Sequence, residues 1–128
     1  MSLDKTFTGT NWPEESEDMK VVQLSIDGNP CLRFPTKEYR EGSHGAILTV
    51  TLMKNGVPYE KIVGRSEVRI PALIGVGYKV HGMGKAKIDV GQRLAHFYGS
   101  SYDYGIGINT EHLECIRSLH PDWKIEVQ

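Results

Sequence analysis

Residues 19–34 read MKVVQLSIDGNPCLRF, and this stretch decides the fold class that the sequence predicts. From Val21 to Ile26 apolar, mostly β-branched residues alternate with polar ones, as in a strand with one buried face. The dipeptide Asp27-Gly28 then favours a tight hairpin turn, because both central residues of such a turn take positive φ angles. Cys31–Phe34 is the expected return strand. An antiparallel hairpin therefore begins the ordered part of the chain.

A second hairpin is predicted over residues 46–63. The window Ala46–Met53 (AILTVTLM) has the strongest strand pattern in the chain, with Ile47 and Met53 on the same face. Residues 54–56 (KNG) are the expected turn, and residues 57–63 the return strand. Pro58 favours an edge position for that strand, because proline cannot donate a backbone hydrogen bond.

The segment from residue 67 to residue 98 predicts further extended structure and then a short helix. Residues 73–80 and 86–88 alternate as strands, so residues 81–84 (HGMG) are interpreted as a hairpin loop. A helix is expected from about residue 89 to Tyr98, because Asp89 and Gln92 resemble a capping box and Gly99 suits the position after a helix. A continued strand is the alternative for this segment.

The C-terminal part predicts a loop, a helix and a strand. Residues 99–107 (GSSYDYGIG) are a glycine- and tyrosine-rich loop, and Asn109 or Thr110 caps a helix that His120-Pro121 ends. Residues 123–127 alternate as a final strand. The predicted fold is α+β: a mainly antiparallel sheet built from hairpins, with one or two short helices in the C-terminal half packed on one side. Residues 1–18 are interpreted as a flexible leader, pinned by Phe7 or Trp12, and residues 19–128 as a single domain.

Composition narrows the function classes. The chain has 128 residues, with 15 Lys plus Arg against 16 Asp plus Glu, so a generally basic nucleic-acid-binding protein is excluded while a local charged patch is not. Cys31 and Cys115 belong to no CxxC motif and are expected to be reduced and mostly buried. The N-terminal residues contain no apolar segment. We therefore expect a cytoplasmic protein with no signal peptide and no membrane span.

Positive charge nevertheless gathers in one region. The segment from Arg65 to Arg93 contains six basic residues and only two acidic ones. If it forms strands, the side chains of Lys79 and His81 lie on one face of a strand, and so do those of Lys85 and Lys87. Several tyrosines lie nearby, and tyrosines among glycine and serine are typical of binding surfaces. The leading hypothesis is a small binding protein without catalytic activity, which contacts an anionic ligand or a protein partner. Its expected contact residues are Lys79, His81, Lys85, Lys87, Tyr98, Tyr102 and Tyr104.

Two other functions stay open. The first is a small enzyme for an anionic substrate, in which His81 or His96 transfers protons, helped by Asp103; it requires a pocket where a histidine meets a carboxylate. The second is an assembly or inhibitor module, such as a homodimer, whose exposed strand edges pair with another chain. The glycine-rich residues 75–85 match neither a Walker nor a dinucleotide-binding motif. We expect no metal and no cofactor, and the overall charge disfavours nucleic acid as the ligand.

Overall fold

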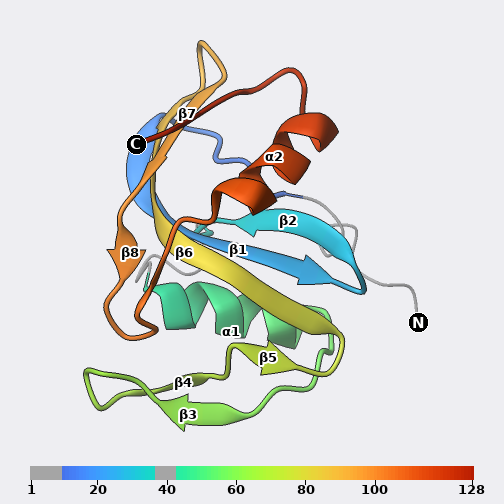
Figure 1. Ribbon diagram of the computed structural model, residues 1–128, viewed down its shortest axis with the longest axis vertical. Coiled ribbons are helices and arrows are strands. Elements are labelled where there is room, and N and C mark those ends of the chain that lie inside the picture. Colours follow the sequence, from blue (N-terminus) through green and yellow to red (C-terminus); the bar gives the residue numbers. More distant parts are fainter. Residues whose placement is uncertain (1–9, 37–42) are drawn as a thin grey trace.

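The computed structural model describes residues 10–36 and 43–128. Its main sheet has the strand order β10-β7-β6-β1-β2, with β5 added beside β6, and two strand pairs, β3-β4 and β8-β9, lie outside it (Figure 1). The elements are β1 (Glu17–Ile26), β2 (Asn29–Arg33), α1 (His44–Lys54), β3 (Lys61–Val63), β4 (Arg69–Pro71), β5 (Ile74–Gly75), β6 (Tyr78–Asp89), β7 (Leu94–Tyr98), β8 (Ser100–Ser101), β9 (Ile106–Gly107), α2 (Thr110–Leu119) and β10 (Lys124–Val127).

The first hairpin is confirmed. β1 and β2 pair antiparallel, and the turn between them contains Asp27 at φ +50° and Gly28 at φ +83°. Both angles are positive, as the Asp-Gly signal requires. β1 is also an interior strand of the sheet, because β6 pairs antiparallel with its other edge.

The segment before β1 packs onto the fold. The Leu32 N–H donates to Thr10 Oγ1 over 3.0 Å, and the Phe34 N–H donates to Asn11 Oδ1 over 2.8 Å, so this segment covers the outer edge of β2. The Trp12 ring stacks on Trp123, with 4.1 Å between ring centroids. β1 starts at Glu17, two residues before the expected boundary. The other proposed anchor, Phe7, lies outside the described residues.

The second predicted hairpin is wrong, because residues 44–54 form α1. Ser43 caps the helix by accepting a hydrogen bond from the Ala46 N–H, which satisfies one of the unpaired amides of the first turn. The buried side chains follow helical rather than alternating spacing, and the supposed strand residue Met53 is 67% exposed. Burial of this apolar stripe against the sheet therefore overrides the β-branched composition. Those buried residues are His44, Ile47, Leu48, Thr51 and Leu52.

The predicted loop at residues 81–84 is also wrong, because β6 runs without a turn from Tyr78 to Asp89. Its glycines mark a close approach of backbones. A Cβ atom on Gly82 would lie 2.7 Å from the Gly107 carbonyl oxygen, and one on Gly84 would lie 2.6 Å from that of Tyr98. The segment leading into α2 thus passes directly over this part of β6, which only glycine permits. His81 is the extra residue of a β-bulge, since Leu24 pairs with Val80 and Gln23 with Gly82.

The helix predicted from residue 89 to Tyr98 is replaced by a turn and a strand. Asp89 Oδ1 does accept a hydrogen bond from the Gln92 N–H, as a capping box would begin, but the chain then reverses at Arg93, whose φ is +50°. β7 pairs antiparallel with β6 and buries Ala95 and Phe97. The C-terminal helix and strand are confirmed as α2, with Asn109 as its cap, and β10.

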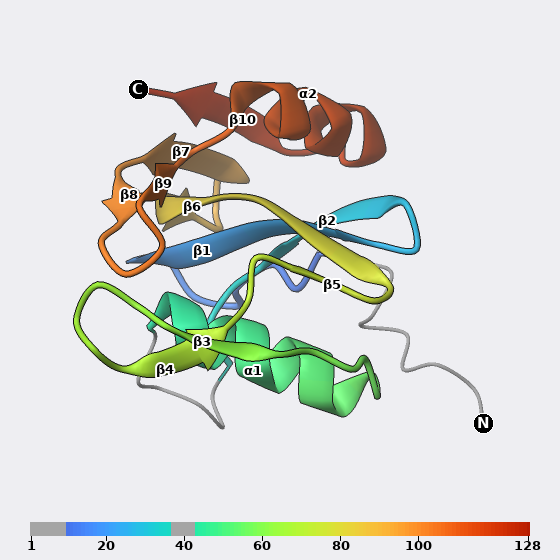
Figure 2. The ribbon, with the colours of Figure 1, turned by 60° about the horizontal axis from the view of Figure 1, so that its bottom comes forward.

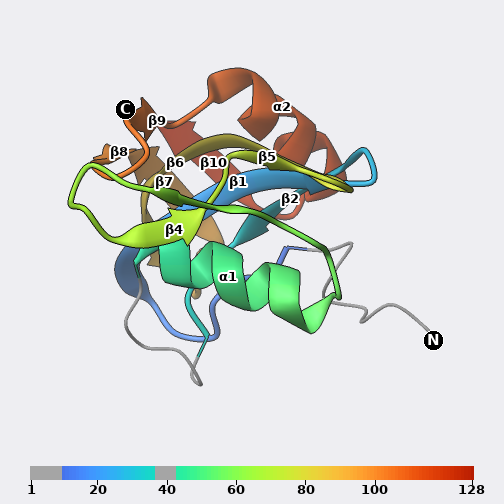
Figure 3. The same ribbon diagram turned by 90° about the horizontal axis from the view of Figure 1, so that it is seen from below.

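The two helices lie on opposite faces of the sheet (Figures 2 and 3). In β1, Val22 and Leu24 pack with α1, whereas Val21 belongs to the cluster that contains Leu113 and Ile116 of α2. β10 joins β7 in parallel, so the sheet is mixed. The expectation of helices only in the C-terminal half and on one side is therefore wrong, while the α+β class with a mostly antiparallel sheet holds.

The cap of α1 allows a direct test of this helix. Ser43→Ala is expected to lower the free energy of unfolding by about 1 kcal/mol, because it leaves a first-turn amide without its acceptor. Urea unfolding followed by circular dichroism measures the change. Ser118→Ala in α2 is the control: its hydroxyl lies exposed and bonds only a carbonyl of its own helix, so little change is expected. Equal losses in both variants would contradict the cap assignment.

Candidate functional site

On the side that carries α1, one end of the sheet is left uncovered by the part of the chain that the structure describes. α1 packs below Val80 and Met83, and beyond Met83 the residues of β6 on this face are Lys85 and Lys87. Lys85 lies directly between Lys20 of β1 and Tyr98 of β7, its partners in the two neighbouring strands. Lys87 lies likewise between Asp18 and His96. We call these six residues the open sheet face.

The three lysines of the open sheet face have no ionic partner within 4.0 Å among the described residues. The Tyr98 hydroxyl donates to Asp18, at 2.6 Å from each carboxylate oxygen, and this contact raises the pKa of Tyr98. Lys20 and Lys85 line a hollow whose other wall, residues 11–19, carries acidic side chains. The positive charge in this hollow therefore comes from two strand residues, Lys20 of β1 and Lys85 of β6.

Lys79 and His81 lie on the opposite face from Lys85. Lys79 pairs with Ser25, whose hydroxyl is 2.9 Å from His81 Nε2, and the His81 ring stacks on His112 of α2 with centroids 4.8 Å apart. The bulge at His81 changes the phase of β6, and the structure therefore separates the two halves of the predicted basic hairpin. Burial, and then the neighbouring Lys79 ammonium, lowers the pKa of His81.

The tyrosines in and beside the predicted loop at residues 99–107 also lie in different places. Tyr104 packs against the core and its hydroxyl donates to the Pro71 carbonyl oxygen over 2.7 Å; burial raises its pKa. Tyr102 is 71% exposed. Of the seven predicted contact residues, the structure brings Lys85, Lys87 and Tyr98 together on the open sheet face, and places Tyr102 on the loop and Lys79 and His81 on the face of α2.

Between β1 and α2 lies a buried polar cluster that the sequence does not reveal. Gln23 is fully buried; its Oε1 accepts from the Asn109 N–H over 2.7 Å and its Nε2 donates to the Asn109 carbonyl oxygen over 2.9 Å. The same Nε2 is 3.2 Å from His112 Nδ1, and His112 Nε2 donates to the Leu24 carbonyl oxygen over 3.0 Å. His112 is therefore neutral, with its proton on Nε2, and burial lowers its pKa to about 4.

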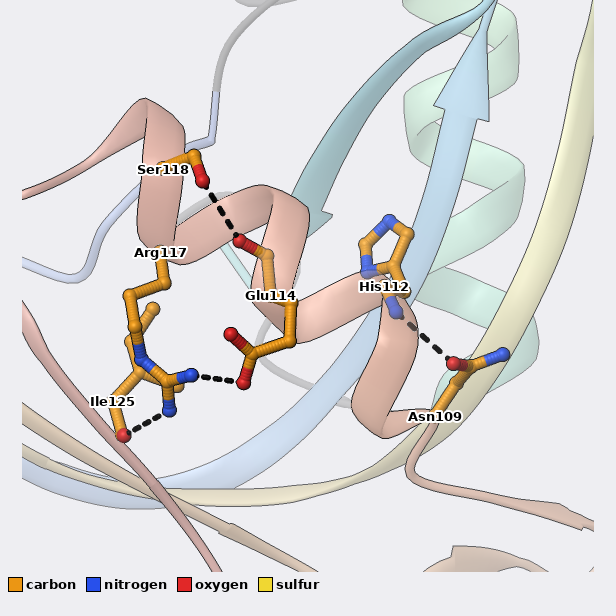
Figure 4. A network of polar contacts seen from close by, with 6 residues as sticks. All are labelled: Asn109, His112, Glu114, Arg117, Ser118 and Ile125. Atoms are coloured by element: carbon orange, nitrogen blue, oxygen red, sulfur yellow. Dashed lines mark hydrogen bonds and ion pairs between the residues drawn. The ribbon is translucent and has the colours of Figure 1, made fainter.

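The far end of α2 is tied to β10. Arg117 donates to Glu114 within the helix and to the Ile125 carbonyl oxygen over 2.7 Å, while the Asn109 side chain accepts from the His112 N–H at the start of the helix (Figure 4). α2 is thus anchored by hydrogen bonds at both ends.

The groups of the acid–base alternative lie apart. His81 contacts Ser25; His96 lies 3.7 Å from Glu126 on the open sheet face; and Asp103 lies in the β8-β9 loop. Asp103 accepts hydrogen bonds from the hydroxyl and the N–H of Ser66, which lower its pKa. The structure brings none of these three residues into contact with another, so they do not form one catalytic group.

The cysteines and Lys20 lie in positions that the sequence did not fully predict. Cys31 is buried as expected, but Cys115 is exposed on α2, and the two are not bonded. Lys20 was missed as a site residue, because it lies far along the chain from the β6 lysines. The signal that could have found it is its phase: it shares a face with Val22 and Leu24 in β1.

Within the described residues no three His, Cys, Asp or Glu side chains gather as a metal site would require. Neither α1 nor α2 has the length and apolar character that crossing a membrane requires. No protein-family model matches the chain, and no curated protein resembles it significantly in sequence.

The buried imidazole predicts acid sensitivity. Burial lowers the pKa of His112 to about 4 in the folded chain, below the usual histidine pKa of about 6.5, so the unfolded chain takes up more protons between these two pH values. Its contribution of roughly 3 kcal/mol is thus present above pH 6.5 and is lost as the pH falls through this window. His112→Gln is expected to flatten the dependence of unfolding free energy on pH, measured by urea unfolding. An unaltered slope in His112→Gln would contradict the assignment.

Proposed function

We propose that the protein is a binding protein without catalytic activity, and that the open sheet face takes an anionic ligand. The observation that carries this proposal is the direct cross-strand pairing of Lys20 with Lys85, with Lys87 two residues further along β6. Like charges directly opposite each other in a sheet destabilise it. The Lys20–Lys85 pairing lowers stability, and none of the three lysines forms an ion pair within 4.0 Å among the described residues. Such an arrangement suits a site that accepts negative charge from outside.

The neighbouring side chains support the same reading. Tyr98 adjoins Lys85 and presents a rigid ring beside it, and His96 adjoins Lys87 and supplies ring nitrogens. His96 is half-buried, with its ring centroid 6.1 Å from that of Tyr98. Aromatic and cationic groups on adjacent strands suit a ligand with both an anionic and a planar part. An acidic surface of a protein partner would suit the same face for the same reason. We further propose that the protein binds its ligand in the cytoplasm.

The acid–base enzyme has less support than binding. It needs a histidine that meets a carboxylate inside a pocket, and the one such contact described, His96 with Glu126, lies on the open sheet face with the carboxylate 61% exposed. His81 meets a serine hydroxyl instead of a carboxylate. We therefore do not base a function on these histidines.

Charge reversal tests the proposal. Lys85→Glu and Lys20→Glu are expected to weaken binding of inorganic pyrophosphate and adenosine triphosphate by about tenfold or more, measured by isothermal titration calorimetry at low salt. Neither change should lower the free energy of unfolding, because each replaces a like-charge pair with an opposite-charge pair. A short single-stranded oligonucleotide is titrated in parallel, and tighter binding of it would assign the ligand to nucleic acid.

Lys79→Glu provides the matched control. This lysine lies on the same strand and is also exposed, but it is on the face of α2, so binding should be retained. If wild-type protein binds none of the anions, or if Lys79→Glu weakens binding as much as Lys85→Glu does, the open sheet face is not the site.

A further inference from the structure

The outer edge of β3 is a strand edge without cover in the described part of the chain. β3 pairs with β4 alone, and all three of its residues are exposed, with Ile62 at 42% and Val63 at 68%. In Figure 1, β3 forms the lower margin of the molecule, with β4 between it and the rest of the fold. This arrangement leaves both backbone groups and apolar side chains of β3 facing outward.

The hydrogen-bond phase of the β3-β4 pair shows which backbone groups are free. The Ala72 N–H donates to Glu60 O over 2.7 Å and the Gly64 N–H donates to Val68 O over 2.9 Å. In this register Ile62 is the bonded partner of Ile70 between them. The N–H and C=O groups of Lys61 and Val63 therefore point away from β4. The position of Pro71 is consistent with this hydrogen-bond pattern, because it lies opposite Lys61 in a pair where no backbone N–H donor is needed.

In the main sheet, by contrast, the outer edge of β2 is covered and one outward carbonyl group of β10 is occupied. Thr10 and Asn11 bond to the outer edge of β2, and Arg117 donates to the outward-facing Ile125 carbonyl oxygen of β10. Covered edges prevent pairing with other chains. β3 lacks such cover among the described residues; its short length and Lys61 are the features of the strand that limit pairing with other chains.

We propose that β3 pairs antiparallel with β3 of a second copy of this chain, forming a two-fold symmetric dimer. A two-fold axis at Ile62 places Lys61 opposite Val63 of the second copy and Val63 opposite its Lys61. Both are then hydrogen-bonded pairs, which uses all the outward groups that the phase leaves free. The Ile62 side chains face each other in the closely spaced, non-bonded pair. This inference is independent of the open sheet face.

The alternative registers are disfavoured by observations on the same strand. An axis at Lys61 would place the two lysines directly opposite each other, which is repulsive. An axis at Val63 would require free backbone groups at residue 65, but the Arg65 N–H already donates to the Asp103 carbonyl oxygen. Only the axis at Ile62 uses the free groups without a like charge in an opposing pair. Val68, 57% exposed beside Gly64, adds apolar area next to the strand.

A charge-exchange experiment tests the dimer and its register together. Wild-type protein is expected to dimerise in analytical ultracentrifugation at micromolar to high micromolar concentration. Ile62→Lys and Ile62→Glu should each raise the dimer dissociation constant by about tenfold or more, because like charges then meet at the axis. An equimolar mixture of the two variants should recover the dimer, since opposite charges meet there instead.

Leu119→Glu is the control, because this side chain is also exposed but lies at the end of α2. Circular dichroism confirms that each variant is folded. Hydrogen exchange provides a second measurement: dimerisation should slow the Lys61 and Val63 amides and leave the Ile62 amide, already bonded to β4, unchanged. A monomeric wild type, a dimer insensitive to Ile62 substitution, or a mixture that stays monomeric would each overturn the proposal.

Discussion

The buried side-chain amide of Gln23 is the contact on which the arrangement of this fold depends. It lies in β1, an interior strand of the sheet, and bonds both backbone groups of Asn109, the residue that caps α2. Leaving this buried amide without its hydrogen-bond partners would cost several kcal/mol of folding free energy. The contact therefore fixes the position of the segment before α2 over β6. Gly82 and Gly84 make room for that passage. The position of α2, and with it the whole second face of the sheet, follows from this contact.

The same geometry explains why one end of the sheet stays open. α1 is short and covers only the part of its face that carries Val80 and Met83, while the strands β1, β6 and β7 extend beyond it. Residues past that point alternate between the core of α2 and solvent, so every second one must be polar or charged. Here those positions hold Lys20, Lys85 and Lys87, which gives a surface of three cations with a tyrosine and a histidine beside them.

The two proposed contact surfaces lie on different parts of the fold. α2 and β10 are fastened together by Arg117, and the edge of β2 is closed by the residues that precede β1. Within residues 10–36 and 43–128 no segment covers the open sheet face or the outer edge of β3, and the two lie on different elements. A ligand on the first would not compete for backbone groups with a partner on the second. Such a separation allows binding and assembly to be altered independently.

Local signals determined part of this protein by themselves. The Asp27-Gly28 turn, the alternation of β1 and the Asn109 cap act through neighbouring residues, and each was predictable. Tertiary structure alone decided that residues 46–53 form a helix, because burial against the sheet outweighs their β-branched composition, and that Gly82 and Gly84 serve a close approach rather than a turn. It also decided the candidate site: a bulge at His81 turns Lys79 away from Lys85, and pairing across strands brings in Lys20. Register and bulges arise from contacts between distant segments, which no local pattern records.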